Sequence, residues 1–353
     1  MRNLKIFILL CLAASQVFAF KVIDMVGREV EIKKEVKKVV PLSSTLRMMV
    51  YMGMSDMAVA TEAIEKRDLD SRPYTVASHV HSANLPVVAE GGAGRAADLE
   101  KIAALKPDVI LTSFIDRQSA DSISQKTGIP VIVLSYGANG YDENSFFTSL
   151  KILGAISGKT KRAEELIGYI KSLDAKLESF SKGKTAQKAY IGGVANRGQH
   201  GIGSTEADFF GFKRSGLVNA ADATGKKGHL FLDKEFVLKA NADVLFVDAG
   251  GYGNITEEYA KEPKFFELIP AVKKGKVFMS LPNVFYGPNV ETMYANAFFY
   301  AKSAYGVDIN MEKTAGEIFV KFTGKDAYPL MRARYGGYSK LLFNNGKITR
   351  EGR

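Results

Sequence analysis

The chain has 353 residues, of which 46% are hydrophobic and 24% charged, and this composition excludes a disordered, fibrous or low-complexity protein. Such a length is long for one compact core and suits two lobes. The 48 Lys and Arg residues outnumber the 38 Asp and Glu residues, but they are scattered, without the basic block or zinc-finger spacing of a nucleic-acid-binding protein. The net charge of +10 suits an anionic small molecule as partner, and equally a protein that is kept soluble by its charge.

The N-terminus has the pattern of a secretory signal peptide. Two basic residues precede an apolar run over 6–14, and small residues follow, so we expect residues 1–19 to be removed on export. The only cysteine is Cys11, and the bulky Leu10 before it argues against lipoprotein processing, so no lipid anchor is expected. The mature chain then contains no cysteine, which excludes disulfides, thiol catalysis and cysteine metal ligands.

Strands and helices are predicted to alternate along the chain, and this order indicates parallel α/β layering. In the first half we expect residues 62–95 to be mostly loop and strands at 36–42, 109–113 and 129–134. Helices are expected at 45–53, at 98–106 and at 145–158, with a further helix that ends at about residue 126. A long amphipathic helix over 161–181 follows. The second half is predicted to contain strands at 189–194, 244–248 and 276–280 and helices at 207–215, 233–240, about 290–305 and 311–343.

A repeat with a constant offset of 135 residues joins the two halves. Four identical pairs carry it: Asp98 and Asp233, Glu100 and Glu235, Asp108 and Asp243, Val109 and Val244. In each copy, acidic residues begin a helix, where the helix dipole favours them, and a turn then leads into a β-rich strand. The matched pattern suggests two similar α/β lobes.

Three segments resemble the periplasmic binding proteins for iron chelates and cobalamin. Residues 22–30 (VIDMVGREV) resemble the opening of that family, and 98–108 resemble its "LE…LKPD" motif. Residues 235–243 resemble the second-lobe counterpart, with Ala242 where the family usually has proline. The similarity covers about residues 22–305.

This resemblance implies two Rossmann-like lobes with parallel sheets, joined by one long helix, with the ligand held between the lobes. Here the N-terminal lobe would span 20–159, the linking helix 160–182 and the C-terminal lobe with its terminal helices 183–345, leaving 346–353 as a frayed tail. Members of the family are periplasmic and deliver their ligand to an ABC permease dimer in the inner membrane. No intrinsic cofactor is implied.

The resemblance also places a histidine and a tyrosine in the cleft. His229 precedes the second motif helix, where some ferric-siderophore binders have a histidine that pairs with a tyrosine of the last lobe, and Tyr286 lies in the matching loop. A phenolate and an imidazole together suit Fe(III) that a tetradentate chelate leaves under-coordinated. Both residues could instead stack on a ligand ring or support their loops.

Arginines are the candidates for holding an anionic ligand. Arg197 follows the strand at 189–194 in a polar, glycine-flanked loop, and the carboxyl ends of parallel strands are where ligands bind. Arg95 lies in a glycine-rich turn before a helix and could also face an anion, and Thr45 and Arg47 at the start of the first helix are weaker candidates. The alternative for each arginine is an ordinary solvated side chain.

Other patterns admit competing interpretations. The glycine-rich loop at 92–97 loosely matches a dinucleotide fingerprint, although a flexible turn explains it as well. His79 and His81 would share one face of an extended chain and could hold a metal, or could lie in a solvated loop. Glu100 and Glu235 could cap their helices, but the resemblance implies that one glutamate of each lobe docks into an arginine pocket of the permease.

The sequence as a whole favours a non-catalytic periplasmic binding protein for an anionic Fe(III) chelate of the siderophore type. It has no nucleophile elbow, HExxH metal motif or P-loop. One alternative keeps the fold but changes the ligand to cobalamin, haem, a nickel chelate, or molybdate or tungstate. The other is an exported nucleotide-dependent oxidoreductase that uses the glycine-rich loop.

Overall fold

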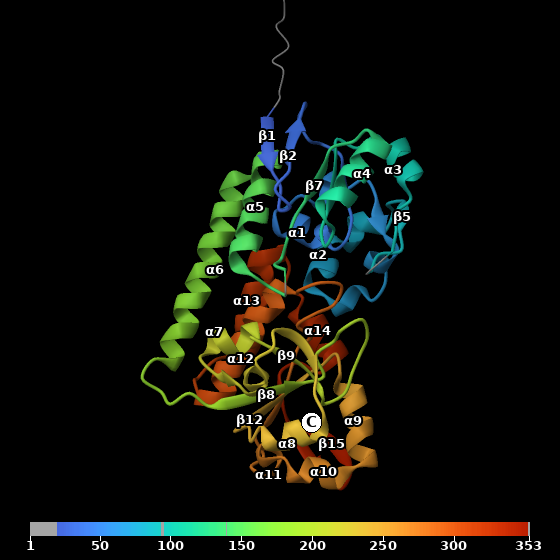
Figure 1. Ribbon diagram of the computed structural model, residues 1–353. Helices are drawn as coiled ribbons and strands as arrows, with labels where there is room; N and C mark the ends of the chain where they lie inside the picture. The colour runs from blue at the N-terminus through green and yellow to red at the C-terminus, as the bar shows by residue number, and fades with distance from the viewer. Residues whose placement is uncertain (1–19, 93–94, 139, 352–353) are drawn as a thin grey trace, which may run out of the picture.

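The computed structural model describes residues 20–92, 95–138 and 140–351, so the expected signal peptide and Cys11 lie outside the described residues. Two α/β lobes are stacked along one axis and joined at one side by the long helix α6 (Figure 1). This is the fold class expected from the sequence. None of the helices in the described ranges is long and apolar enough to cross a membrane.

A three-stranded parallel sheet in the order β3-β6-β7 forms the centre of the N-terminal lobe. All residues of these strands are buried, as expected for a parallel sheet that is covered on both faces. The strands are β3 (Val39–Pro41), β6 (Val109–Thr112) and β7 (Val131–Val133), with the short parallel pair β4 (Thr61–Glu62) and β5 (Val87–Ala89) beside them. The helices are α1 (Thr45–Tyr51), α2 (Pro73–Ser82), α3 (Leu99–Leu105), α4 (Arg117–Thr127) and α5 (Glu143–Ser157).

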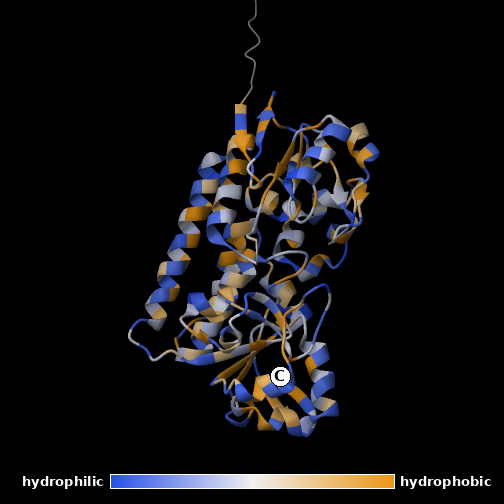
Figure 2. Ribbon diagram, viewed as in Figure 1, coloured by the Kyte–Doolittle hydropathy of each residue, from blue (hydrophilic) through white to orange (hydrophobic). Residues whose placement is uncertain are grey.

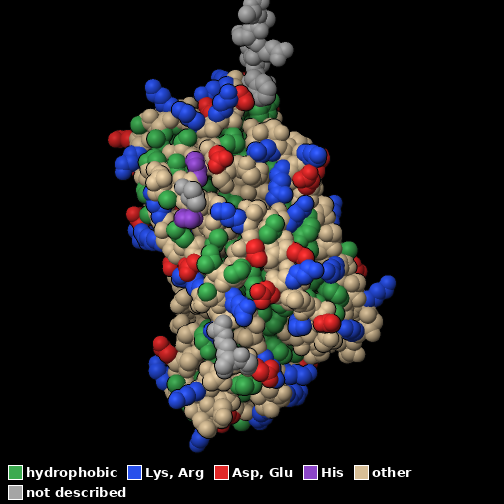
Figure 3. Space-filling view, turned by 180° about the vertical axis from the view of Figure 1, so that it is seen from behind, with side chains coloured by type: hydrophobic (Ala, Val, Ile, Leu, Met, Phe, Trp, Pro, Cys, Tyr) green, Lys and Arg blue, Asp and Glu red, His purple; other side chains and the backbone are tan. Residues whose placement is uncertain are grey.

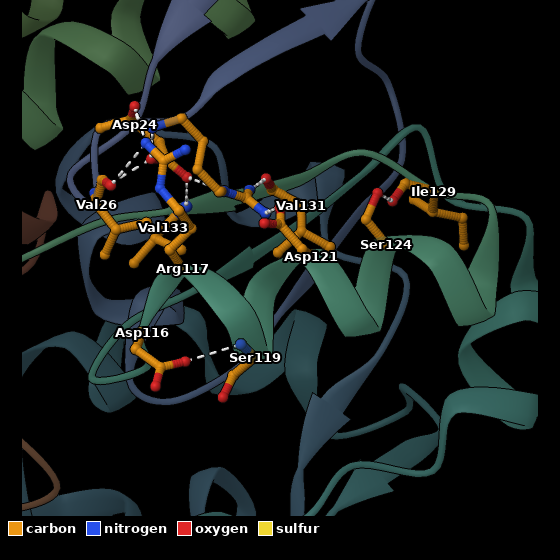
Figure 4. A network of polar contacts seen from close by, with 12 residues as sticks. Asp24, Val26, Asp116, Arg117, Ser119, Asp121, Ser124, Ile129, Val131 and Val133 are labelled. Atoms are coloured by element: carbon orange, nitrogen blue, oxygen red, sulfur yellow. Dashed lines mark hydrogen bonds and ion pairs between the residues drawn. The ribbon is translucent and has the colours of Figure 1, made fainter.

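The opening motif at 22–30 forms an antiparallel hairpin, β1 (Phe20–Ile23) and β2 (Glu29–Ile32), that is fastened to this sheet. Asp24 accepts hydrogen bonds from the Arg28 Nε at 3.0 Å and from the backbone N–H of Val133 at 3.2 Å (Figure 4). The Arg28 guanidinium also pairs with Asp121 of α4 at 3.0 Å and donates to the Val131 carbonyl. The aspartate and arginine of the motif therefore serve the fold of the N-terminal lobe.

Helix α6 (Thr160–Ser181) is continuous for 22 residues and links the lobes. Its buried apolar residues recur at helical spacing, and in Figure 2 its ribbon alternates between hydrophobic and hydrophilic colours. The helix packs against α5 of the N-terminal lobe and against α7 and α12 of the C-terminal lobe. This confirms the long amphipathic helix predicted from the sequence.

The C-terminal lobe contains a six-stranded sheet in the order β10-β8-β12-β13-β14-β15, parallel from β10 to β13 and antiparallel beyond. Its strands are β8 (Lys188–Gly192), β10 (Val218–Asn219), β12 (Val244–Asp248), β13 (Val277–Ser280), β14 (Ser339–Asn344) and β15 (Lys347–Arg350). A separate antiparallel pair is formed by β9 (Ser204–Ala207) and β11 (Gly228–Phe231). The helices are α7 (Phe210–Ser215), α8 (Lys234–Lys239), α9 (Tyr252–Lys261), α10 (Pro263–Leu268), α11 (Pro270–Lys273), α12 (Val290–Tyr305), α13 (Met311–Thr323) and α14 (Tyr328–Tyr335).

The sequence prediction differs from the structure near the C-terminus. The helix expected over 311–343 is divided into α13, α14 and β14, with breaks at Gly324 and Gly336, which both have positive φ. The tail expected to be frayed over 346–353 contains β15, which pairs with β14 across an Asn345-Gly346 turn. Asn-Gly is a strong hairpin signal because both residues tolerate positive φ, and here they have φ of 48° and 73°.

The stretch 62–95, expected to be mostly loop, contains helix α2. The buried face of α2 carries Tyr74, then Ser78 one turn later and Ser82 two turns later, so its helical period is hard to recognise in the sequence. Those hydroxyl-bearing residues interrupt the apolar pattern on which a helix prediction depends. As a result His79 and His81 lie on a helix and not on an extended chain.

The two terminal helices lie between the lobes rather than on the far side of the C-terminal lobe. Helix α13 packs against α1 and α2 of the N-terminal lobe, and α14 packs against residues 69–71 (Figure 1). Arg334 of α14 pairs with Asp68 and Asp70 at 2.7 Å each. The contacts between the lobes therefore extend well beyond the linking helix.

We expect ligand binding to move the lobes only modestly, because bending α6 would break helical hydrogen bonds and the α13 and α14 contacts would resist separation. Small-angle scattering should give the same radius of gyration, within error, with and without ligand. A clear compaction on addition of ligand would contradict this expectation.

Candidate functional site

The carboxyl ends of the central strands of both lobes bear residues in an unusual backbone conformation. Left-handed φ values of 53–68° occur at Ser43 and Ser44 after β3, Phe114 after β6, Arg197 after β8 and Tyr286 after β13. Non-glycine residues in this region are strained, and such strain gathers at functional sites. The ends of parallel strands are also the usual place of ligand sites in α/β folds. These loops define the candidate site between the lobes.

Tyr286 crosses between the lobes to Glu62 at the end of β4. Its hydroxyl donates a hydrogen bond to the Glu62 carboxylate at 2.5 Å. Gly91 has φ of 77°, and a Cβ built on it would lie 3.2 Å from the Tyr286 hydroxyl and 2.5 Å from Ile64, so this close approach requires glycine. Burial, with the adjacent Glu62 charge, raises the pKa of Tyr286 well above its ordinary value.

Glu62 itself is only 4% exposed. Burial raises the pKa of its carboxyl to about 7, against the opposing effect of hydrogen bonds from Tyr286 and from the backbone N–H groups of Ser43 and Ser44. This residue is not among the candidates predicted from the sequence, because it lies in the stretch expected to be loop. No motif marks it in the sequence.

Arg47, a candidate for ligand binding, is fully buried and spans the contact between the lobes. Its guanidinium donates to the Phe285 carbonyl at 2.7 Å and to the Asn289 Oδ1 at 3.0 Å. It also lies over the Tyr74 ring, 4.5 Å from the ring centre. Thr45 is buried as well, and its hydroxyl donates to the Leu42 carbonyl at 2.9 Å.

His229 lies on the face of the β9–β11 pair that is turned toward the N-terminal lobe. It is directly opposite Glu206 in the antiparallel register, so the two side chains share a face. The Glu206 Oε1 lies 3.5 Å from the Cβ position of Gly140 in the N-terminal lobe. His229 and Tyr286 thus come from the same lobe and both lie on the side that faces the other lobe, although their hydrogen-bond partners differ.

Aromatic side chains surround His229. The Ser204 hydroxyl lies 2.8 Å from its Nε2, and the rings of His200 and Phe231 have their centres at 6.5 Å and 4.7 Å from its own. Phe231 is 64% exposed, unusually high for a large apolar side chain beside polar loops. Burial lowers the pKa of His229, which favours the neutral imidazole that a metal requires.

Arg197 and Arg95 are both exposed. Arg197 has the left-handed conformation noted above, and the backbone N–H of Arg95 donates to the Gly92 carbonyl at 3.3 Å. Each side chain is therefore accessible to a ligand. Over the face shown in Figure 3, basic side chains are interspersed with acidic ones.

The described histidines and acidic residues are dispersed. Among the described residues, no three His, Cys, Asp or Glu side chains are grouped so that they could hold a metal ion. On α2 the exposed His79 is separated from His81, whose Nε2 lies 2.9 Å from the Ala58 carbonyl oxygen, and residues two apart on a helix do not face each other.

The repeat at offset 135 forms equivalent structures in the two lobes. Asp98 caps α3 by accepting from the Lys101 N–H at 3.0 Å, and Asp233 caps α8 by accepting from the Phe236 N–H at 2.7 Å. Glu100 and Glu235 lie in the first turns and are exposed. Since the aspartates supply the caps, the glutamates are not needed for capping, and Glu235 pairs on the helix surface with Lys239 at 2.6 Å.

Comparison with known proteins agrees with this architecture. The family model described as "Periplasmic binding protein" matches residues 42–283. The ABC transporter substrate-binding lipoprotein YvrC of Bacillus subtilis (strain 168) is 25% identical over 274 residues, which cover 75% of this chain and 79% of the relative.

Solved structures with 17–20% identity show the same fold. The molybdate periplasmic binding protein MolA of Haemophilus influenzae, with molybdate bound, has a TM-score of 0.66 at 20% identity, covering 87% of this chain and 98% of that one. Helicobacter pylori CeuE in a Ni-His complex has a TM-score of 0.64 at 18% identity, covering 87% and 96%. A Saccharomonospora viridis protein of an ABC-type Fe3+-hydroxamate transport system has a TM-score of 0.55 at 17% identity, covering 82% and 100%. The family model matches most of the chain and the two-lobe fold accompanies it, so this protein belongs to the periplasmic binding protein family.

Proposed function

We propose that this periplasmic binding protein captures an anionic Fe(III) chelate of the siderophore type between its lobes and delivers it to an ABC permease. The observation that carries the proposal is the position of Tyr286 and His229, a phenol and an imidazole from one lobe that both lie on the side facing the other. Fe(III) is a hard ion that accepts phenolate and imidazole donors. The protein would complete the coordination that a tetradentate chelate leaves open.

The remaining candidates have supporting or neutral roles. Arg197 and Arg95, which are exposed on loops of the two lobes, would neutralise the charge of the chelate. The exposed rings of Phe114 and Phe231 would pack on its apolar surface. Arg47 and Thr45, which are already hydrogen-bonded internally, would shape the site from behind.

A second ligand class is an oxyanion or a nickel chelate. The MolA structure holds molybdate and the CeuE structure holds nickel with histidine, and both share the fold of this chain. Strained serines that present backbone N–H groups at 43 and 44 suit an oxyanion. Cobalamin and haem are further alternatives on this fold, whereas membership of a transport family favours binding over the oxidoreductase alternative.

The test is a ligand panel on the mature protein. Tyrosine fluorescence serves as the signal because the chain has 15 tyrosines and no tryptophan. We expect a ferric biscatecholate to bind more tightly than molybdate, a nickel–histidine complex, cobalamin or haem. Saturable binding of only one of the other ligands would reassign the substrate, and binding of none would contradict the proposal.

Substitutions at the site should separate metal contact from charge neutralisation. We expect Tyr286→Phe to remove the phenolate-to-iron charge-transfer band and to weaken tetradentate chelates more than hexadentate ones. Arg197→Ala should weaken anionic chelates by about 1.5–3 kcal/mol, roughly ten- to a hundredfold, through loss of a charge-assisted hydrogen bond. Arg332→Ala, which removes an exposed side chain of α14, is the control and should leave affinity unchanged. Wild-type affinity in both site variants would mean that the cleft is misplaced.

Delivery would use Glu100 and Glu235. We propose that each docks into an arginine pocket on one half of the permease dimer, because the repeat places one exposed glutamate on the first turn of the corresponding helix of each lobe. The protein would act in the periplasm after removal of residues 1–19. YvrC is a lipoprotein, whereas Leu10 before Cys11 leads us to expect no lipid anchor in this chain.

A further inference from the structure

Glu62 already occupies the polar groups from both lobes that an anionic ligand would need. Its carboxylate accepts the Tyr286 hydroxyl of the C-terminal lobe at 2.5 Å and faces the backbone N–H groups of Ser43 and Ser44 of the N-terminal lobe. Three of these four residues lie at the carboxyl ends of central strands with left-handed φ. A carboxylate of the chain thus fills an anion-binding position between the lobes.

Donors without a partner lie beside the loop that carries Tyr286. Among the described side chains, the buried Ser44 hydroxyl and the Arg47 Nη1 and Nε have no hydrogen-bond partner. The first two each lie 3.0 Å from the Cβ position of Gly287, next to Tyr286 in the chain. Buried donors without partners are costly, and in native proteins they usually mark a place where another group binds.

Glu62 differs from its acidic neighbour in where its partner lies. The side chain is almost fully buried, and burying a carboxylate is costly unless it is well paired. Its neighbour Glu65 has separate partners within the N-terminal lobe, with Tyr74 at 2.7 Å and Arg72 at 3.8 Å. Of these two acidic residues, Glu62 is the one bonded across the lobes.

We propose that Glu62 is an internal competitor for the ligand: its carboxylate holds Tyr286 and the serine N–H groups in the free protein, and an incoming catecholate, carboxylate or oxyanion displaces it. This inference rests on the proposed function in one respect, that the ligand presents anionic oxygens to the donors. A competing group lowers apparent affinity by the fraction of molecules in which it blocks the site.

The experiment compares Glu62→Ala and Glu62→Gln with wild type, using a ferric biscatecholate and molybdate as separate probes. Loss of the competitor should tighten the binding of at least one probe, about tenfold in Glu62→Ala, the equivalent of roughly one net hydrogen bond. Glu62→Gln keeps the shape of the side chain and should give a smaller gain in affinity. It replaces Glu62→Ala in the comparison if that variant is poorly folded. The control is Glu90→Ala, an exposed glutamate just after β5 that pairs with Arg67 and should leave both affinities unchanged. Tightening of catecholate alone would identify a chelate, and of molybdate alone an oxyanion.

A second measurement, without any ligand, separates this inference from the proposed function. Hydrogen exchange of the backbone at 285–289 and 43–45 should become faster in Glu62→Ala, because the contact between these loops is lost. If neither probe binds any variant but exchange is faster, the proposed ligand is wrong and the internal contact stands. If a probe binds, unchanged affinity in both Glu62 variants would overturn the inference, whatever the exchange. So would weaker binding in Glu62→Gln and Glu62→Ala, since Glu62 would then contact the ligand directly.

Discussion

Replacement of Arg47 by methionine should strongly destabilise the protein. The methionine fills a similar volume but removes the donors to the Phe285 carbonyl and Asn289 and the positive charge that faces the buried Glu291. Loss of one member of a buried charged network costs about 3–5 kcal/mol. We therefore expect the free energy of unfolding to fall by about that amount in urea denaturation monitored by circular dichroism.

The control for this prediction is Arg332→Met, which removes an exposed arginine paired with Glu312. Exposed ion pairs contribute little, so its effect should stay below about 1 kcal/mol. Equal stability of Arg47→Met and wild type would show that the contact between the lobes contributes little to folding. A parallel loss in both variants would indicate a general effect of removing positive charge.

Simultaneous replacement of Glu100 and Glu235 by alanine should abolish most uptake by cells while leaving the soluble protein intact. Both side chains are exposed, and the caps of their helices come from Asp98 and Asp233. Charged contacts of this kind set the rate and orientation of encounter, so the remaining uptake should depend strongly on salt. Each single variant should show an intermediate loss.

Chelate affinity and melting temperature serve as the internal controls for the docking prediction. Both should stay near the wild-type values in the double variant. Normal uptake would show that these glutamates do not dock, and a fall in affinity parallel to the fall in uptake would place them in the ligand site instead.

The lobes and their linker could be predicted from the sequence because those features depend on strong local patterns. The buried strands of both lobes are short continuous apolar runs, and α6 has an apolar stripe of helical period. The repeat of Asp98 and Asp233 marks equivalent helix caps in both lobes. The prediction is wrong at α2, where serines on the buried face conceal the period, and at the C-terminal hairpin, where the Asn345-Gly346 turn divides a stretch expected to end in a helix and a frayed tail.

The candidate site could be predicted only in part, because its groups come together through contacts between distant segments. Tyr286 and Glu62 are 224 positions apart, and neither residue type reveals the other in a single sequence. Arg47 could be recognised as important from its position at the start of a helix, but its full burial depends on Phe285 and Asn289 of the other lobe. His229 and Tyr286 became candidates through the resemblance to a family. Arg197 became a candidate through its position in a loop directly after a predicted strand.

The central claim is that the ligand binds between the lobes, against the loops that carry Tyr286 and His229. Hydrogen–deuterium exchange of the mature protein, with and without the tightest-binding member of the ligand panel, tests it most directly. We predict that exchange slows at 43–45, 228–231 and 285–288, on both sides of the boundary between the lobes. Exchange should stay unchanged on the outer faces of α4 and α10. Slower exchange confined to one outer surface, with none at these three segments, would contradict the account.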